Sequence, residues 1–250
     1  MVRSRKIGKC IYCGRDDVKL SREHVIPYGL GGGYTLLAAS CDACAKMTSD
    51  FEKHALRDVY LSARSFYNLN SRHGKLPEEA EILIEENGRE KIVKYPVKKY
   101  GALICLLGYP LPAYLDKRKY QPGVTVNGNY FLSTKTGEDL KDLAKDIGTK
   151  TITIKATFSG NRFEKTIVKM AYCFALLKYG LESFDKIYVL PGIKGEKEDI
   201  GMWFGSKEVM RGNEEVEVIL NVVNKEIIVA LRIFGKLPVP TYVVVVGKLK

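Results

Sequence analysis

The segment 10–44 reads CIYCGRDDVKLSREHVIPYGLGGGYTLLAASCDAC and contains two Cys-x2-Cys pairs that are separated by 27 residues. Each pair can place two thiolates on one tight turn, and two such turns together supply the four ligands of a tetrahedral zinc site. A redox-active pair would need only one such turn, and a reducing compartment disfavours disulfides. The spacing therefore predicts a closed, structural zinc site formed by Cys10, Cys13, Cys41 and Cys44.

The composition of the chain is that of a globular protein with a basic surface. Its 250 residues are 46% hydrophobic, which is enough for one large domain or two. No run of eighteen or more apolar residues occurs, and the basic N-terminus lacks the apolar segment of a signal peptide, so we expect a cytoplasmic protein without a membrane anchor. The net charge of +11 favours a polyanionic partner such as nucleic acid, although a solvated surface rich in lysine and glutamate would give the same balance.

The residues between and just after the cysteine pairs carry the candidate chemistry. The motifs EHVIP, LGG, ASCDAC and TSDFE follow one another within residues 23–52. This order resembles the HNH, or ββα-metal, endonuclease family, and most of all a bacterial subset that shares EHxIP, LGG, ASCxxC and TSxFE motifs. The later segments RFEKTIVKMAYCFALLKYGLESF and PTYVVVVG resemble the C-terminal part of the same subset.

The resemblance implies both a fold and a reaction. The fold would be an N-terminal ββα-metal module, in which a hairpin bearing Glu23 and His24 is followed by a loop and a helix. His24 would be the general base that activates water against a phosphodiester, a task that suits a neutral imidazole near pH 7. Glu23 would be a catalytic residue that ligates a divalent cation. Neighbouring strand residues point to opposite faces, so the strand must bend or bulge to bring both to one site. The alternative for His24 is a structural role in packing the zinc module.

One position departs from the family pattern. Many HNH proteins carry Asn or His directly after the second cysteine pair, where it ligates the metal from the helix, and here that position is Ala45. Glu52 lies two turns further along, with Thr48 one turn before it on the same face, and it belongs to the shared TSDFE motif. We therefore expect Glu23 and Glu52 to hold Mg²⁺ or Mn²⁺, which prefer hard oxygen ligands. The alternative for Glu52 is an ordinary solvated glutamate.

Several basic side chains are candidates for contact with phosphate. Arg57 and Arg64 are seven residues apart on one helical region and are expected to share a face near the site, unless that face is simply solvated. His54 lies off the face of Thr48 and Glu52 and is expected at the surface or in contact with phosphate. An N-terminal arm could hold the nucleic-acid backbone independently of base sequence; its basic residues are Arg3, Arg5, Lys6 and Lys9.

The whole chain is predicted to be an α+β protein with two domains. Residues 1–73 would form the HNH module, 74–80 a linker, and 80–250 an antiparallel sheet packed by one long helix, with a role in target recognition or partner binding. The tyrosines and basic residues of 114–123 could contact nucleic acid, or pack on the sheet as part of a surface loop. Helices are expected at 138–147 and 162–179, and strands at 81–86, 91–97, 100–107, 150–158, 216–223, 227–234 and 241–247.

These motifs predict a metal-dependent HNH endonuclease that hydrolyses DNA and uses structural zinc together with catalytic Mg²⁺ or Mn²⁺. Two alternatives stay open. One is a zinc-stapled DNA-binding or adaptor protein whose nuclease site is degenerate, with Ala45 as the mark of decay. The other is a nuclease directed at RNA, because the module contacts the backbone and does not distinguish the sugar.

Overall fold

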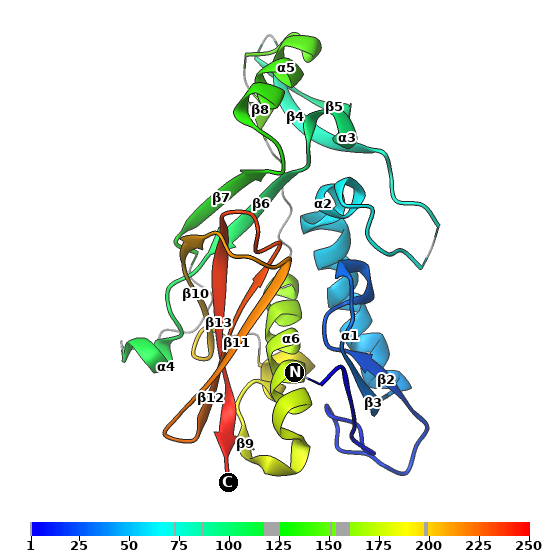
Figure 1. Ribbon diagram of the computed structural model, residues 1–250, viewed down its shortest axis with the longest axis vertical. Coiled ribbons are helices and arrows are strands. Elements are labelled where there is room, and N and C mark those ends of the chain that lie inside the picture. Colours follow the sequence, from blue (N-terminus) through cyan, green and yellow to red (C-terminus); the bar gives the residue numbers. More distant parts are fainter. Residues whose placement is uncertain are drawn as a thin grey trace.

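The computed structural model describes residues 2–72, 74–86, 88–117, 126–150, 152–153, 161–197 and 200–250. Within these ranges an N-terminal unit lies on one side of a long helix and a β-sheet lies on its other side, as Figure 1 shows. None of the helices in these ranges has both the length and the apolar character needed to cross a membrane.

The N-terminal unit is a small sheet followed by a helix. β3 (Thr35–Cys41) is its central strand, and β1 (Ser4–Lys6) pairs with β3 in parallel while β2 (Leu20–His24) pairs with it antiparallel. A short 3₁₀ turn, η1 (Tyr28–Leu30), lies in the connection from β2 to β3. α1 (Asp42–His54) begins directly after β3, so the second cysteine pair spans the junction of strand and helix.

The pairing of β2 with β3 is interrupted immediately before the Glu23–His24 pair. The register shifts between Ser21 and Glu23, where two steps along β2 correspond to four along β3. Ala38 lies in the longer segment and has a φ of 49°, in the left-handed region. A bulge of this kind bends the ladder and increases its local twist. The irregularity is located where Glu23 and His24, although neighbours on one strand, both line the same cleft.

The helical region continues beyond α1 through a π-helical turn. This turn, η2 (Ala55–Val59), leads into α2 (Leu61–Phe66). The N–H of Tyr60 donates to the carbonyl oxygen of Ala55 at 3.0 Å, which is a five-residue step. One extra residue in a helical turn rotates the following side chains by about 100° relative to an uninterrupted α-helix. Residues of α2 therefore face a direction that the periodicity of α1 does not predict.

The helix α6 (Arg162–Tyr179) lies between α1 and the C-terminal sheet (Figure 1). Its side chains from Phe163 to Leu177 are buried with few exceptions, as expected of a helix covered on several sides. β9 (Phe184–Ile187) pairs with the last residues of β13. The sheet is antiparallel throughout, in the order β10 (Phe204–Met210), β13 (Val239–Leu249), β12 (Glu226–Ile233) and β11 (Val216–Val223).

One hydrophobic core joins the N-terminal unit to the sheet. It includes Cys10 and Leu36 from the first unit, Phe174 from α6 and Val244 from β13. The division of the chain at 74–80 stays a prediction about folding units. In the structure, side chains from both segments pack against one another through α6.

A smaller core lies at the far end of the molecule, at the top of Figure 1. Side chains from α3 (Val97–Tyr100) and α5 (Gly137–Ile147) pack into it. β4 (Glu79–Glu86) pairs antiparallel with both β5 (Arg89–Pro96) and β8 (Ile152–Thr153). The remaining elements are β6 (Leu103–Gly108), which pairs with β7 (Gly128–Ser133), and the short helices α4 (Ala113–Asp116), η3 (Leu181–Ser183) and α7 (Leu190–Lys194).

The elements expected from the sequence can be compared with these bounds. The expected helix 162–179 and strand 216–223 agree residue for residue with α6 and β11. Most of the expected strand 150–158 lies outside the described residues, within which only 152–153 forms β8. The loop 114–123 lies outside them from residue 118 onward. β1, β7, β9 and β10 are additional to the strands that the sequence predicts.

Candidate active site and metal centre

Four cysteine sulfurs gather at one end of the N-terminal unit. Cys10 and Cys13 lie on the turn after β1, Cys41 ends β3, and Cys44 lies in the first turn of α1. The four sulfurs lie within 4.8 Å of one another, and the Sγ atoms of Cys13 and Cys41 are 3.7 Å apart. A tetrahedral site with Zn–S bonds of about 2.3 Å has sulfur–sulfur edges of about 3.8 Å. The four cysteines therefore fit a structural metal ion such as zinc.

Main-chain hydrogen bonds prepare one of these thiols for metal binding. Burial acts to raise the pKa of Cys10, but N–H groups of Cys41, Cys13 and Tyr12 directed at its sulfur lower that pKa to about 7. The turn itself is closed by the N–H of Gly14, which donates to the carbonyl oxygen of Cys10 at 2.8 Å. A thiol with such a pKa readily becomes the thiolate, which is the form that binds zinc.

A cleft of about 700 Å³ lies between β2, α1 and the residues 70–72 and 75–77. Glu23, His24 and Glu52 line it, so the structure brings together the three side chains for which the sequence predicts chemistry. Clefts lined by one sign of charge attract ligands of the opposite sign. This part of the surface suits a nucleic-acid backbone, because the cleft is also lined by five exposed cations: Arg22, Lys53, Arg57, Arg72 and Lys75.

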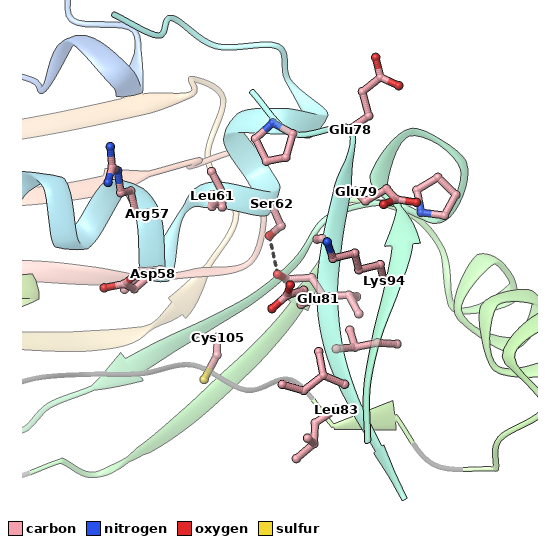
Figure 2. A pocket seen from close by; sticks show the side chains of 17 residues that line it. Arg57, Asp58, Leu61, Ser62, Glu78, Glu79, Glu81, Leu83, Lys94 and Cys105 are labelled. Carbon is pink, nitrogen blue, oxygen red and sulfur yellow. Dashed lines mark hydrogen bonds between the residues drawn. The ribbon is translucent and has the colours of Figure 1, made fainter. Parts of the chain in front are cut away.

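A second hollow of about 770 Å³ adjoins this cleft, and Arg57 and Leu61 line both. Figure 2 shows it between the η2–α2 region and the β4–β5 hairpin. Its lining has two cations, Arg57 and Lys94, against four acidic residues, namely Asp58, Glu78, Glu79 and Glu81. The excess of negative charge disfavours phosphate. We therefore assign the candidate active site to the basic cleft.

Lys169 of α6 contacts both acidic residues of the site. Its Nζ lies 2.6 Å from Oε1 of Glu23 and 2.7 Å from Oε1 of Glu52, and it also donates to the main-chain oxygen of His24. The side chain is fully buried. Burial acts to lower the pKa of Lys169, but the carboxylates of Glu23 and Glu52 raise that pKa above its ordinary value, so the ammonium keeps its charge.

His24 has the properties of a neutral base. Burial lowers the pKa of His24, and the positive charges of Arg72 and Lys169 lower it further. The imidazole ring lies 5.9 Å from the ring of Tyr28, centroid to centroid. Its Nδ1 is buried and has no hydrogen-bond partner among the described residues. An imidazole in this environment is uncharged near pH 7 and can accept a proton from water.

The face of α1 that lines the cleft carries Ala45, Thr48 and Glu52. Ala45 offers no ligand, and the hydroxyl of Thr48 donates to the carbonyl oxygen of Ala45 at 3.2 Å. Within the described residues, the four cysteines are the sole group of three or more metal-ligating side chains. Glu23 and Glu52 are the two carboxylates of this cleft, and the Oε1 atom of each contacts the ammonium of Lys169. Carboxylate oxygens are ligands that Mg²⁺ and Mn²⁺ accept in proteins.

Arg64 is buried beneath the cleft, and its guanidinium donates hydrogen bonds to main-chain oxygens. Its side chain donates to Gly29 from Nε at 2.8 Å, to Leu56 from Nη1 at 3.0 Å and to Asn70 from Nη2 at 3.0 Å. These bonds join the loop after β2, the π turn and the segment after α2. Arg57, by contrast, is exposed where the cleft and the second hollow meet. The two arginines that the sequence places on one face thus have different surroundings.

The basic residues of the N-terminal arm also differ in their surroundings. Arg5 donates to the carbonyl oxygens of Leu177 at 2.8 Å and Lys178 at 2.9 Å, so it satisfies acceptors in the last turn of α6. Arg3 is exposed. His54, at the end of α1, is only 10% exposed, and its Nδ1 contacts the carboxylate of Asp58 one turn later. Arg5 is therefore a helix-capping residue in the structure.

Comparison with known proteins points to one family. Residues 10–60 match the model of the HNH endonuclease family. No curated protein and no solved structure matches the chain. The matched segment contains both cysteine pairs together with Glu23, His24 and Glu52, and members of this family generally act on nucleic acid. The N-terminal segment is thus similar to a nuclease domain and carries a possible four-cysteine metal site.

Five charged site residues lie outside the sequence-based expectations: Arg22, Lys53, Arg72, Lys75 and Lys169. Arg22 directly precedes the Glu-His pair, so its proximity was readable from the motif. Arg72 lies over the ring of Tyr28 at 5.4 Å from the centroid, an interaction that depends on the path of the chain after α2. One feature of the sequence points to Lys169. It lies between apolar residues in the centre of a helix that is apolar on nearly every side, and a lysine there is buried only when it is paired.

Proposed function

We propose that the protein is an HNH endonuclease that hydrolyses phosphodiester bonds of DNA in the basic cleft. One observation carries the proposal: Glu23, His24 and Glu52, from a bulged strand and from the facing helix, line one cleft together with five exposed cations. A structural role for His24 alone would not require a basic cleft beside it. The family match over residues 10–60 supports the same reaction class.

In this proposal His24 is the general base. The lowered pKa keeps its imidazole neutral, so it takes a proton from the attacking water as the new P–O bond forms and the P–O bond to the leaving sugar oxygen breaks. Glu23 and Glu52 would hold Mg²⁺ or Mn²⁺, which supplies Lewis-acid stabilisation of the phosphorane and of the leaving oxygen. Zinc at the four cysteines would be structural, because a site closed by four thiolates leaves no open position.

The exposed cations of the cleft would position the substrate. Arg22, Arg57 and Arg72 are suited to phosphate oxygens, and such contacts fix the backbone without reading bases. Arg3 remains a candidate for a further backbone contact outside the cleft. The region after residue 80 would select the target, because its sequence carries no catalytic motif.

Plasmid cleavage tests the proposal. Wild-type protein with Mg²⁺ or Mn²⁺ is expected to convert supercoiled DNA into nicked or linear forms, and His24→Ala is expected to lower the rate by about 10²- to 10⁴-fold. Chelation followed by addition of Mg²⁺ alone, with zinc content measured in parallel, separates the catalytic ion from the structural one. Undiminished cleavage by His24→Ala would exclude His24 as the base.

The same assay separates the alternatives. DNA binding without cleavage under every metal condition would favour the adaptor with a degenerate site. Parallel reactions with single-stranded DNA and with RNA of the same sequence identify the preferred substrate. Cleavage of RNA alone would replace DNA in the proposal and leave the roles of His24, Glu23 and Glu52 unchanged.

A further inference from the structure

A single ammonium group joins the three functional residues of the cleft. Lys169 Nζ contacts Oε1 of Glu23 at 2.6 Å and Oε1 of Glu52 at 2.7 Å, and it donates to the main-chain oxygen of His24. A lysine ammonium has three donor hydrogens. One of them is donated to the main-chain oxygen of His24, and the two carboxylate oxygens lie within ion-pair distance of the same Nζ.

The ammonium contacts the site from the protein interior. Glu23 and Glu52 line the cleft whereas Lys169 does not, and Lys169 is fully buried. Burial raises the pKa of Glu52, and the positive charge of Lys169 opposes that shift and favours the carboxylate. Lys169 can therefore orient the carboxylates while leaving the cleft side free for an ion or a substrate.

The face of α6 that carries Lys169 is held in register with the N-terminal unit by two further hydrogen bonds. The hydroxyl of Thr166, three residues before, lies 3.3 Å from the main-chain oxygen of Phe51 in α1 and 3.0 Å from that of Arg162 in its own helix, and its one hydrogen is shared between them. Tyr172, three residues after, donates to the main-chain oxygen of Ile11 in the first cysteine turn at 2.7 Å. Spacings of three along a helix place these side chains on one face. The position of Lys169 relative to β2 and α1 is thus fixed on both sides.

We propose, on the basis of the nuclease function above, that Lys169 is a positioning residue that aligns Glu23, Glu52 and the backbone of His24. The active site is then completed by α6, which lies outside the matched segment 10–60. The segment 10–60 supplies the ligands and the base, and α6 supplies the cation that sets their geometry. Groups that orient metal ligands from behind typically change metal affinity or activity by about 10- to 100-fold when removed.

Lys169→Met tests this role, with Lys178→Met as the control on the exposed end of the same helix. Zinc content and circular dichroism first establish that both variants are folded. Mn²⁺ affinity, measured by titration without DNA, is expected to fall by about 10- to 100-fold in Lys169→Met alone. The kcat for an oligonucleotide duplex is expected to fall by a similar factor, while KM stays within about twofold because the exposed cations are untouched.

The outcomes separate the two proposals. Absence of cleavage by the wild-type protein would overturn the nuclease function, and the Mn²⁺ titration would still report on Lys169. Wild-type cleavage with equal Mn²⁺ affinity and equal kcat in both variants would overturn the positioning role. If Lys169→Met does not fold, Lys169→Arg keeps the charge but has a planar, wider set of donors. It is then expected to fold with kcat lowered by about tenfold at unchanged KM, and wild-type kcat in Lys169→Arg would contradict the proposal.

Discussion

Gly32 passes so close to His24 that a Cβ atom at residue 32 would lie 3.3 Å from Nδ1 of the imidazole. The same Cβ would lie 2.6 Å from the carbonyl oxygen of Ile26, which is closer than real Cβ atoms approach an oxygen. The loop after β2 can therefore fold back over His24 only with glycine at this position. The second glycine of the LGG motif is therefore required because the backbone passes close to the proposed base.

Gly32→Ala is expected to lower kcat by at least about tenfold, because either the loop or the imidazole must move, and small displacements of catalytic groups are costly. Zinc content should be unchanged, since the substitution lies away from the cysteines. Gly33→Ala is the matched control, because the nearest atom to its added Cβ would be 4.0 Å away. Equal kcat in the two variants would show that the approach of Gly32 does not position His24.

The pH dependence of cleavage should reflect the environment of His24. The base works in its neutral form, so activity is present above the pKa of His24 and is lost as the pH falls through it. Burial, with Arg72 and Lys169, places that pKa below the ordinary 6.5. We therefore expect the acid limb of the profile of kcat/KM against pH, which reports the free enzyme, to have its midpoint below pH 6.5.

Arg72→Ala provides the control for this profile. Removal of a positive neighbour makes protonation of His24 easier, so the midpoint is expected to move to higher pH. The measurement is kcat/KM across the acid range in both proteins. A midpoint that stays in place, or one above pH 6.5 in the wild-type protein, would contradict the assignment of the acid limb to His24.

Loss of the zinc site is expected to destabilise the whole fold and not only the cysteine turn. Cys13 is exposed, so Cys13→Ser removes a ligand without opening a cavity in the core. Ile11, in the same turn, accepts a hydrogen bond from Tyr172 of α6 and is itself buried in the shared core. If about 3 kcal/mol of the zinc-binding free energy contributes to folding, the Tm falls by about 10 °C.

Cys105→Ser is the control for this experiment, because Cys105 is a buried cysteine outside the metal cluster. We expect it to retain one zinc ion per chain by elemental analysis, whereas Cys13→Ser retains little or none. Thermal unfolding followed by circular dichroism gives the Tm of each protein. Full zinc content in Cys13→Ser would show that the four cysteines do not act as one site.

The sequence predicts features that depend on local spacing. Four cysteines in two pairs converge because each pair is confined to one turn, whatever the path between them. The helix 162–179 agrees with α6 because helical apolar spacing runs up to Gly180, whose φ of 80° ends the helix. The strand 216–223 agrees with β11 because turn residues separate it from the next apolar run.

Features that depend on the path of the chain in space could not be predicted in this way. A spacing of seven residues puts Arg57 and Arg64 on one face only if the helix is regular, and the π turn at Ala55–Val59 breaks that regularity. Lys169 gains its role from Glu23 and Glu52, which are more than a hundred residues earlier in the chain. β10 was not predicted because FGSKEVM mixes polar and apolar residues without a strand-like alternation.

Arg57 and Arg64 should respond to substitution in opposite ways. Arg64→Ala leaves the main-chain oxygens of Gly29, Leu56 and Asn70 without their donor, so the free energy of unfolding is expected to fall by about 3 kcal/mol. Arg57→Ala, at an exposed position, should change it by less than about 0.5 kcal/mol. Urea denaturation measures both values under identical conditions.

DNA binding completes the comparison of the two arginines. Arg57→Ala is expected to weaken binding and to reduce the slope of log Kd against log salt by about one, because one phosphate contact is lost. Fluorescence anisotropy with Ca²⁺ in place of Mg²⁺ measures binding at several salt concentrations and limits cleavage. Arg64→Ala, assayed at a temperature where it is folded, should keep the wild-type slope. If instead Arg64→Ala lowers the slope while its stability is unchanged, Arg64 contacts phosphate as the helical spacing alone predicts.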